Sequence, residues 1–305
     1  MDVQLLRRKQ LAGNTAVRAL PANSKTGTVL TLVIMVIAGA IIIAALMWRS
    51  SGGQWFVVET PSMGQAAPVG TLILTQPAKV ANFSTGEIIT FQPPLSTVHE
   101  IYTHRVNAIK NGQISTKGDN NSIADPWLLS DKDIVGKSVV IIPGLGWLLR
   151  SIPYLIIGFL LVWFITKWFI PLKWRSAWRI TGFALVASIT SIILKPFIGL
   201  AVLATTVEGK IAHAIIVSTG MLPVKAETFN GASINLVSGQ LGQLSVPSLA
   251  TKHYYTITTS LNLDFWGWVI FWAVCLIPAI YILVVGLPPV DELKSNTKSL
   301  DPQTS

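Results

Sequence analysis

Long apolar runs alternate with more polar segments along this chain. Residues 28–48 form a run of about twenty residues without a charge, and further apolar runs occupy residues 150–170, 180–203 and 265–287. A helix of about twenty apolar residues is long enough to cross the roughly 30 Å hydrocarbon core of a bilayer. The pattern therefore predicts a membrane protein with about four transmembrane helices.

The segments between these runs have a different pattern. In residues 49–149, short apolar stretches are separated by Gly, Pro and Asn, which is typical of β-strands joined by tight turns. Residues 204–264 contain alternating stretches, such as 233–237 and 254–258, that predict a second small β-rich element. In the first segment we expect a compact, mostly β domain with strands at 55–58, 71–75, 87–91, 101–109, 113–116 and 138–142.

Basic residues predict how these segments are oriented. Asp2 is the one acid among residues 1–27, which contain several Lys and Arg, and residues 171–179 are basic without an acid. Short segments rich in Lys and Arg stay on the cytoplasmic side of a membrane. We therefore expect both ends of the chain, 1–27 and 288–305, to be cytoplasmic, and both β segments to be extracytoplasmic at a plasma membrane.

Two of the apolar runs, the first and the third, allow an alternative interpretation. The first run could be a cleaved signal peptide, but it is longer than the usual apolar region, and no small-x-small site precedes Arg49. We interpret it as a retained anchor. The third run is interrupted by Lys195 and Pro196. An ionisable residue at mid-membrane is a functional candidate, whereas a helix that ends near Leu194 would let the lysine reach the outer interface.

Composition excludes several classes of protein. Hydrophobic residues make up 51% of the chain and charged residues only 12%, which is too apolar for an ordinary soluble protein of 305 residues. The formal net charge is +9, but the basic residues are scattered, so we expect no nucleic acid partner. Cys275 is the single cysteine and lies in an apolar run, which excludes a disulfide framework. The spacing of His, Cys, Asp and Glu predicts neither a metal site nor a cofactor.

Three motifs in the first β segment carry groups that can do chemistry. Thr-Pro-Ser-Met at 60–63 supplies a serine, Tyr-Thr-His-Arg-Val at 102–106 supplies a histidine, and a polar segment at 116–125 supplies two aspartates. Hydrolysis by a serine needs a base for the hydroxyl proton, a group that orients the base, and donors for the developing oxyanion. The segment contains candidates for all three.

Together with Ile-Val-Gly-Lys at 134–137 and Ile-Ile-Pro-Gly-Leu-Gly at 141–146, these motifs resemble the type I signal peptidase family. The similarity is to its endoplasmic-reticulum-like branch, which uses histidine where most bacterial members use lysine, and it covers roughly residues 28–150. It implies a membrane-bound serine endopeptidase that removes signal peptides from exported precursors after small residues at the outer membrane surface. The implied partners are secretory precursor proteins and the lipid bilayer, with the export translocon as a further candidate.

The resemblance also assigns roles to individual residues. Ser62 corresponds to the nucleophile, His104 to the general base, and Asp125 to the residue that orients the histidine. The oxyanion hole would consist of the backbone N–H of Ser62 and the hydroxyl of Thr60. The neighbouring residues with supporting roles are Met63, Arg105 and Asp119.

Other residues compete for these roles. Asp119 is the rival of Asp125, although its simpler interpretation is a turn aspartate that bonds its own backbone. His99 precedes the histidine of the motif by five positions and would point to the opposite face of a regular strand. Lys110 and Lys117 flank this strand, but neither matches the position of the family's lysine base.

The chain also departs from the family pattern. Gly64 stands where a proline is usual, and Ala124 replaces an acid, which leaves Asp125 as the clearer orienting residue. A catalytically silent membrane scaffold or export partner with the same fold is the alternative function. A transporter is a third possibility, suggested by the interruption at Lys195, but the large external β domain disfavours it.

Overall fold

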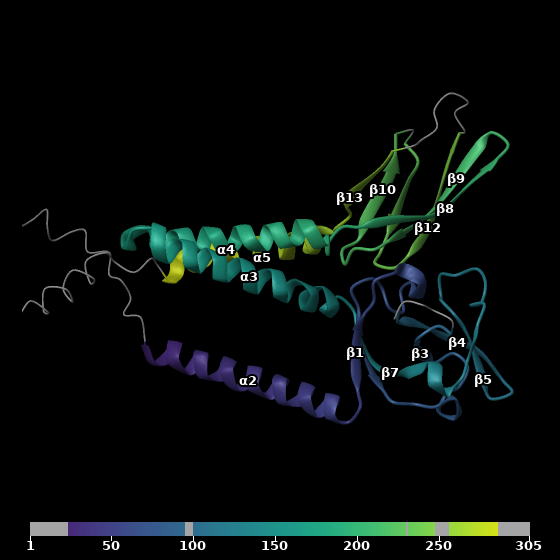
Figure 1. Ribbon diagram of the computed structural model, residues 1–305. Helices are drawn as coiled ribbons and strands as arrows, with labels where there is room; N and C mark the ends of the chain where they lie inside the picture. Colours follow the sequence, from purple (N-terminus) through teal and green to yellow (C-terminus); the bar gives the residue numbers. More distant parts are fainter. Residues whose placement is uncertain (1–23, 95–99, 230, 248–255, 286–305) are drawn as a thin grey trace, which may run out of the picture.

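The chain combines helices with antiparallel sheets in a mixed α/β fold. In the computed structural model, the described residues are 24–94, 100–229, 231–247 and 256–285. Both β units lie at the same end of the helices, as Figure 1 shows. The described helices are α2 (Ser24–Ser50), α3 (Leu145–Phe169), α4 (Leu172–Leu194) and α5 (Phe265–Val285).

The first β unit is built around one antiparallel sheet with the order β1-β2-β7-β3-β4-β5-β6. Side chains that alternate along these strands fill two hydrophobic cores, one around Phe91 and Val106 and one that contains Met63 and Ile73. The second core lies directly under the serine of the Thr-Pro-Ser-Met motif. The strands are β1 (Gln54–Val57), β2 (Leu72–Gln76), β3 (Ile88–Phe91), β4 (Tyr102–Lys110), β5 (Gln113–Lys117), β6 (Leu128–Leu129) and β7 (Ile134–Ile142).

The second β unit consists of two small antiparallel sheets, with the orders β12-β9-β8 and β11-β10-β13. Ile216 and Leu244 from one sheet and Val224, Ala226 and Leu236 from the other form a single buried core. The two sheets therefore pack face to face. The strands are β8 (Leu200–Glu208), β9 (Ile211–Ser218), β10 (Val224–Thr228), β11 (Ser233–Leu236), β12 (Leu241–Pro247) and β13 (Ile257–Leu261).

The third apolar run contains both a helix and the start of a strand. Helix α4 begins at Leu172, inside the segment predicted as a basic loop, and ends at Leu194. Lys195 then adopts a left-handed conformation with φ of 51°, and its N–H bonds to the carbonyl of Ser191. Since Pro196 cannot continue the helix, the chain leaves it here, and the end of the predicted span, from Leu200 on, belongs to β8. The exposed Lys195 is a helix cap and not a mid-helix residue.

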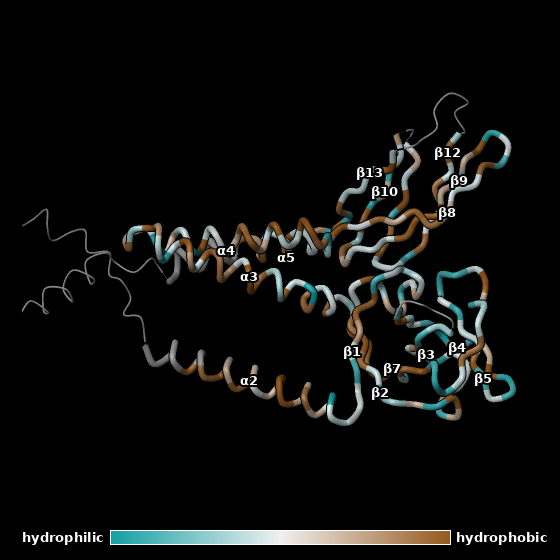
Figure 2. The backbone as a smooth tube through the Cα atoms, viewed as in Figure 1, coloured by the Kyte–Doolittle hydropathy of each residue, from teal (hydrophilic) through white to brown (hydrophobic). Residues whose placement is uncertain are grey.

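The prediction of four transmembrane helices is corrected to two. Among the described residues, only Leu145–Phe169 and Trp174–Leu194 are long and apolar enough to cross a membrane. The apolar stretches described in the other two helices, Met35–Ser50 and Phe265–Leu276, are shorter. Length and composition alone are weak support for a span, but the side chains of α3 and α4 are largely exposed, unlike those of a helix at the centre of a soluble protein. Figure 2 shows stretches of hydrophobic residues along both helices.

Helices α3 and α4 form a tight hairpin. The guanidinium of Arg175, in the first turns of α4, donates hydrogen bonds to the carbonyls of Thr166, Lys167 and Ile170 at the end of α3. These are carbonyls that a helix C-terminus leaves without an intrahelical partner. Residues 1–23 and 286–305, which include most of both predicted cytoplasmic ends, lie outside the described part of the chain.

Candidate active site

Ser62 lies on a short 3-10 turn, Pro61–Met63, that follows β1. Proline favours the first position of such a turn, and the fully buried side chain of Met63 anchors it in the core below. Asn120 fixes the turn from the other side: its backbone N–H donates to the carbonyl of Ser62 at 2.8 Å, and its side-chain amide donates to the carbonyl of Pro61 at 2.8 Å. The turn is thus held by its own core residue and by the segment that follows β5.

His104 lies on β4 with only 4% of its surface exposed. Its ring stands edge-on to the rings of Phe91 and Tyr102, with centroid distances of 6.0 and 5.9 Å. Asp125 lies in the connection between β5 and β6, where its N–H donates to the carbonyl of Thr116 at 2.8 Å. The two side chains come from separate elements, and each is fixed by its neighbours.

These three side chains form one hydrogen-bonded chain. Ser62 Oγ lies 3.0 Å from His104 Nε2, and His104 Nδ1 lies 2.7 Å from Asp125 Oδ2. The hydroxyl of Thr116 donates a further hydrogen bond to Asp125 Oδ2 at 2.6 Å. An ionised Asp125 keeps the imidazole proton on Nδ1, so that Nε2 is free to accept the proton of Ser62. The geometry matches that of a Ser-His-Asp catalytic triad.

Thr60 stands beside the predicted nucleophile. Its hydroxyl oxygen lies 3.4 Å from Ser62 Oγ. A hydroxyl at this distance can donate to an oxyanion that develops on a carbon bonded to Ser62 Oγ. The position therefore agrees with the role that the family resemblance implies for this residue.

Arg105 and Asp119 form an ion pair and not a part of the triad. Nε and Nη2 of Arg105 donate to the two carboxylate oxygens of Asp119 at 2.9 and 2.6 Å, and Nη1 donates to the carbonyl of Gly86. The hydrogen bonds to Asp119 raise the pKa of the Arg105 guanidinium. Because its carboxylate accepts hydrogen bonds from Arg105, Asp119 links β4 to the turn that carries Asn120. The hydrogen bonds of His104 are instead to Ser62 and Asp125.

The other rival residues lie elsewhere. His99 and His253 are outside the described residues. His213 lies on β9 of the second β unit, where its Nδ1 is near the side chains of Ser245 and Gln243. Within the described residues, neither Lys110 nor Lys117 has a hydrogen bond or ion pair to Ser62. Among the same residues, no group of three His, Cys, Asp or Glu side chains is close enough to hold a metal ion.

A cleft of about 720 Å³ opens in front of Ser62 and His104. Two acids lie on it: Glu59, which pairs with Arg150 at 3.2 Å, and Glu100, which accepts a hydrogen bond from the Tyr102 hydroxyl at 2.9 Å. That hydrogen bond raises the pKa of the phenol, and burial adds to the effect. The cleft is lined by residues 55–60, Ser62, residues 100–104 and Arg150.

The sequence does not single out Thr116, Asn120 or the acids of the cleft. Thr116 and Asn120 lie inside the polar motif at 116–125, so the motif could have indicated them as supporting residues. No motif contains Glu59, Glu100 or Arg150.

No protein-family model matches this chain, and a comparison with curated proteins finds no similar sequence. The resemblance to type I signal peptidases therefore depends on short motifs and on the arrangement of the residues that they supply.

Proposed function

We propose that this protein is a membrane-bound serine endopeptidase of the signal peptidase type. The observation that carries the proposal is the hydrogen-bonded chain from Ser62 through His104 to Asp125, which begins in an open cleft. A serine hydroxyl, an imidazole and a buried carboxylate in this order are the groups needed for acyl transfer by a serine nucleophile.

In the proposed reaction, Ser62 Oγ attacks the carbonyl carbon of the scissile peptide bond while its proton passes to His104 Nε2. Asp125 stabilises the imidazolium, and the Thr60 hydroxyl donates to the oxyanion. Collapse of this intermediate breaks the C–N bond, and His104 gives its proton to the leaving amine. Water then attacks the ester on Ser62, with His104 again as the base, and releases the new carboxyl group.

The cleft suits an extended peptide. Strand β1 lies at one edge of the seven-stranded sheet and also lines the cleft. An edge strand presents unpaired N–H and C=O groups, so a substrate in extended conformation can pair with it. The residue beside the scissile bond would then be directed toward Ser62.

The proposal also locates the enzyme at a membrane surface. We take α3 and α4 as helices that cross the bilayer, and both β units lie at one end of them (Figure 1). Arg150, in the first turns of α3, lines the same cleft as Ser62. Cleavage would therefore occur close to the bilayer, where the end of a membrane-held signal peptide emerges.

Cleavage of a precursor with an Ala-x-Ala site by the detergent-purified protein tests the proposal. Wild type is compared with Ser62→Ala, His104→Ala and Asp125→Ala, and His213→Ala serves as the matched histidine control on the second β unit. Loss of cutting in the first three, but not in the control, is the expected result. Wild-type protein that cuts none of several precursors would instead favour the silent scaffold.

A further inference from the structure

The second β unit touches the first at the turn that carries Ser62. We call the turn between β11 and β12, residues 237–240, the Gly239 turn. Gly239 is buried and has a φ of +76°. A Cβ atom on Gly239 would lie 2.3 Å from the carbonyl oxygen of Gly64 and 2.6 Å from its carbonyl carbon. The two backbones are therefore in direct contact, and only glycine fits at this position.

Asn120 lies at the same junction. Its side-chain amide donates to the carbonyl of Pro61 at 2.8 Å and makes a longer contact of 3.4 Å with the carbonyl of Gly239. A Cβ atom on Gly64 would lie 2.6 Å from the side-chain oxygen of Asn120. One amide thus contacts the Ser62 turn and the Gly239 turn at once.

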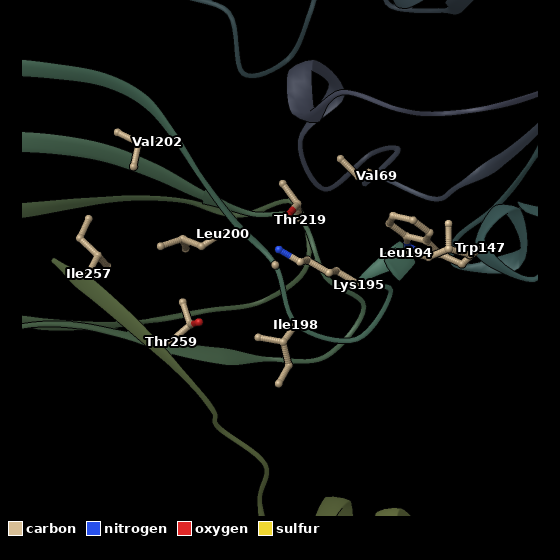
Figure 3. A pocket seen from close by; sticks show the side chains of 11 residues that line it. Val69, Trp147, Leu194, Lys195, Ile198, Leu200, Val202, Thr219, Ile257 and Thr259 are labelled. Carbon is tan, nitrogen blue, oxygen red and sulfur yellow. The ribbon is translucent and has the colours of Figure 1, made fainter. Parts of the chain in front are cut away.

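A second close approach lies between Gly144 and Met221, and a cavity lies where the helix ends meet the second β unit. The cavity, of about 530 Å³, is lined by Val69 of the first β unit, by Trp147 of α3 and Lys195 at the end of α4, and by Leu200 and Thr219 of the second β unit (Figure 3). Where backbone packing is close, movement of one element displaces its neighbour, whereas a cavity transmits little. Of the two close approaches, the one at the Gly239 turn adjoins the Ser62 turn, and it is there that the second β unit can act on Ser62.

We propose that the Gly239 turn positions the nucleophile. The second β unit packs against Gly64, and the hydrogen bonds of Asn120 hold Pro61 and Ser62 in the position that brings Ser62 Oγ to His104 Nε2. This inference rests on the proposed function, because it assigns the second β unit a part in the same site. Asn120 and Gly239 are positioning residues and not catalytic residues. Their loss acts through the Ser62 turn.

Two pairs of variants test the proposal in the full-length protein. Gly239→Ala is compared with Gly209→Ala, since Gly209 also has a positive φ, of +60°, but a Cβ atom there meets nothing within 4 Å. Both changes strain the backbone of the second β unit, and only the first pushes on Gly64. Asn120→Asp, which replaces the donating amide by an acceptor, is compared with Asn121→Asp, which adds the same charge one residue further on.

Steady-state cleavage gives the first readout. We expect Gly239→Ala and Asn120→Asp to lower kcat about tenfold or more with KM within about twofold, because a small displacement of a nucleophile slows the chemical step more than it weakens binding. The two control variants should keep kcat within about twofold of wild type. Equal losses in each test variant and its control, or a loss in KM alone, would overturn the proposal.

Amide hydrogen exchange gives a readout that does not depend on activity. The N–H groups of Gly64 and Ala66 bond to the carbonyls of Pro61 and Met63 within the Ser62 turn. They should exchange faster in Gly239→Ala and Asn120→Asp than in the controls. Unchanged exchange would contradict the positioning role even if the protein cuts precursors. If exchange is faster in the two test variants but the wild-type protein cuts no precursor, the positioning role is kept and the proposed function is rejected. If Gly239→Ala fails to fold, Asn120→Asp tests the same contact from the first β unit.

Discussion

Thr116 has the clearest supporting role among single residues. Its fully buried hydroxyl donates to Asp125 Oδ2 at 2.6 Å. Thr116→Val keeps the shape of the side chain but removes this donor, so the carboxylate loses one of the contacts that orient it. Because a hydrogen bond to a charged group contributes about 1.5–3 kcal/mol, we expect kcat for precursor cleavage to fall about tenfold or more. Steady-state kinetics at several substrate concentrations would measure the loss.

Thr71→Val is the matched control for Thr116→Val. Thr71 is also fully buried in the first β unit, but its hydroxyl has no hydrogen-bond partner among the described residues. The same substitution should therefore leave kcat unchanged. Equal losses of activity in the two variants would mean that the hydroxyl of Thr116 acts on folding and not on Asp125.

The candidate site shows which residues a sequence can indicate. Ser62, His104 and Asp125 lie in motifs with a recognisable order, and the structure brings their side chains together. Thr116 and Asn120 act through hydrogen bonds whose partners depend on how distant segments pack together, and no local pattern records that packing. The choice of Asp125 over Asp119 was also open in sequence, because the engagement of Asp119 by Arg105 exists only in the folded sheet.

At the scale of elements, an ion pair joins β7 to the start of β3. Lys137 Nζ lies 2.6 Å from Glu87 Oε1, and the N–H of Ser84 donates to the other oxygen. The hydrogen bond from Lys137, followed by that from Ser84, lowers the pKa of Glu87 below its ordinary value of 4.5. A carboxyl group with a lowered pKa in the folded state stabilises the fold above the unfolded-state value and loses that contribution as the pH falls through the folded-state value.

Glu87→Gln tests this ion pair. Both side chains are about one-third exposed, so we expect the free energy of unfolding to fall by only about 0.5 kcal/mol at neutral pH. The difference from wild type should shrink as the pH drops below 4.5 and vanish below the folded-state pKa. Urea unfolding in detergent between pH 7 and about pH 3 would measure it, with Glu208→Gln as an exposed control on β8. If the difference in free energy of unfolding between Glu87→Gln and wild type stays constant over this pH range, the ion pair does not stabilise the fold as proposed.

Close packing joins helices α3 and α4. A Cβ atom on Gly158 would lie 2.3 Å from Cγ1 of Val186, whereas a Cβ atom on Gly39 in α2 would meet nothing within 4 Å. Alanine has the higher helix propensity by about 1 kcal/mol, so Gly39→Ala should be neutral or stabilising. Gly158→Ala should destabilise by about 1–3 kcal/mol, because the χ1 angle of a β-branched residue such as Val186 is restricted in a helix. Thermal unfolding in the same detergent would compare the two, and equal shifts in Tm would reject this packing.

The elements themselves were predictable to different degrees. Short apolar stretches divided by Gly, Pro and Asn located the first five strands of the first β unit within a few residues. This pattern did not separate α4 from β8, because the apolar residues of both form one continuous run and hydropathy does not distinguish a helix from a strand there. The boundary depends on the conformation of Lys195. The two-residue strand β6 is too short to have a period.

At the scale of the whole molecule, the sequence predicted two β segments but not their contact. The contact joins backbone to backbone through Gly64 and Gly239, and a glycine has no side chain that could indicate a partner. A second close approach lies between Gly144, just before α3, and Met221 of the second β unit: a Cβ atom on the glycine would be 2.8 Å from the sulfur. Helices and β units are therefore joined near one end.

Cysteine labelling can determine how the proposed membrane protein is oriented. Lys110 is exposed at the tip of the β4–β5 hairpin, and Leu172 is exposed where α4 begins at the opposite end of α3. In a Cys275→Ser background, Lys110→Cys should react with a membrane-impermeant maleimide on intact cells. Leu172→Cys should react only after the cells are permeabilised, because basic residues beside a membrane-spanning helix favour the cytoplasmic side. Reaction of position 172 on intact cells, with position 110 protected, would place the cleft on the side of the membrane where no exported precursor emerges.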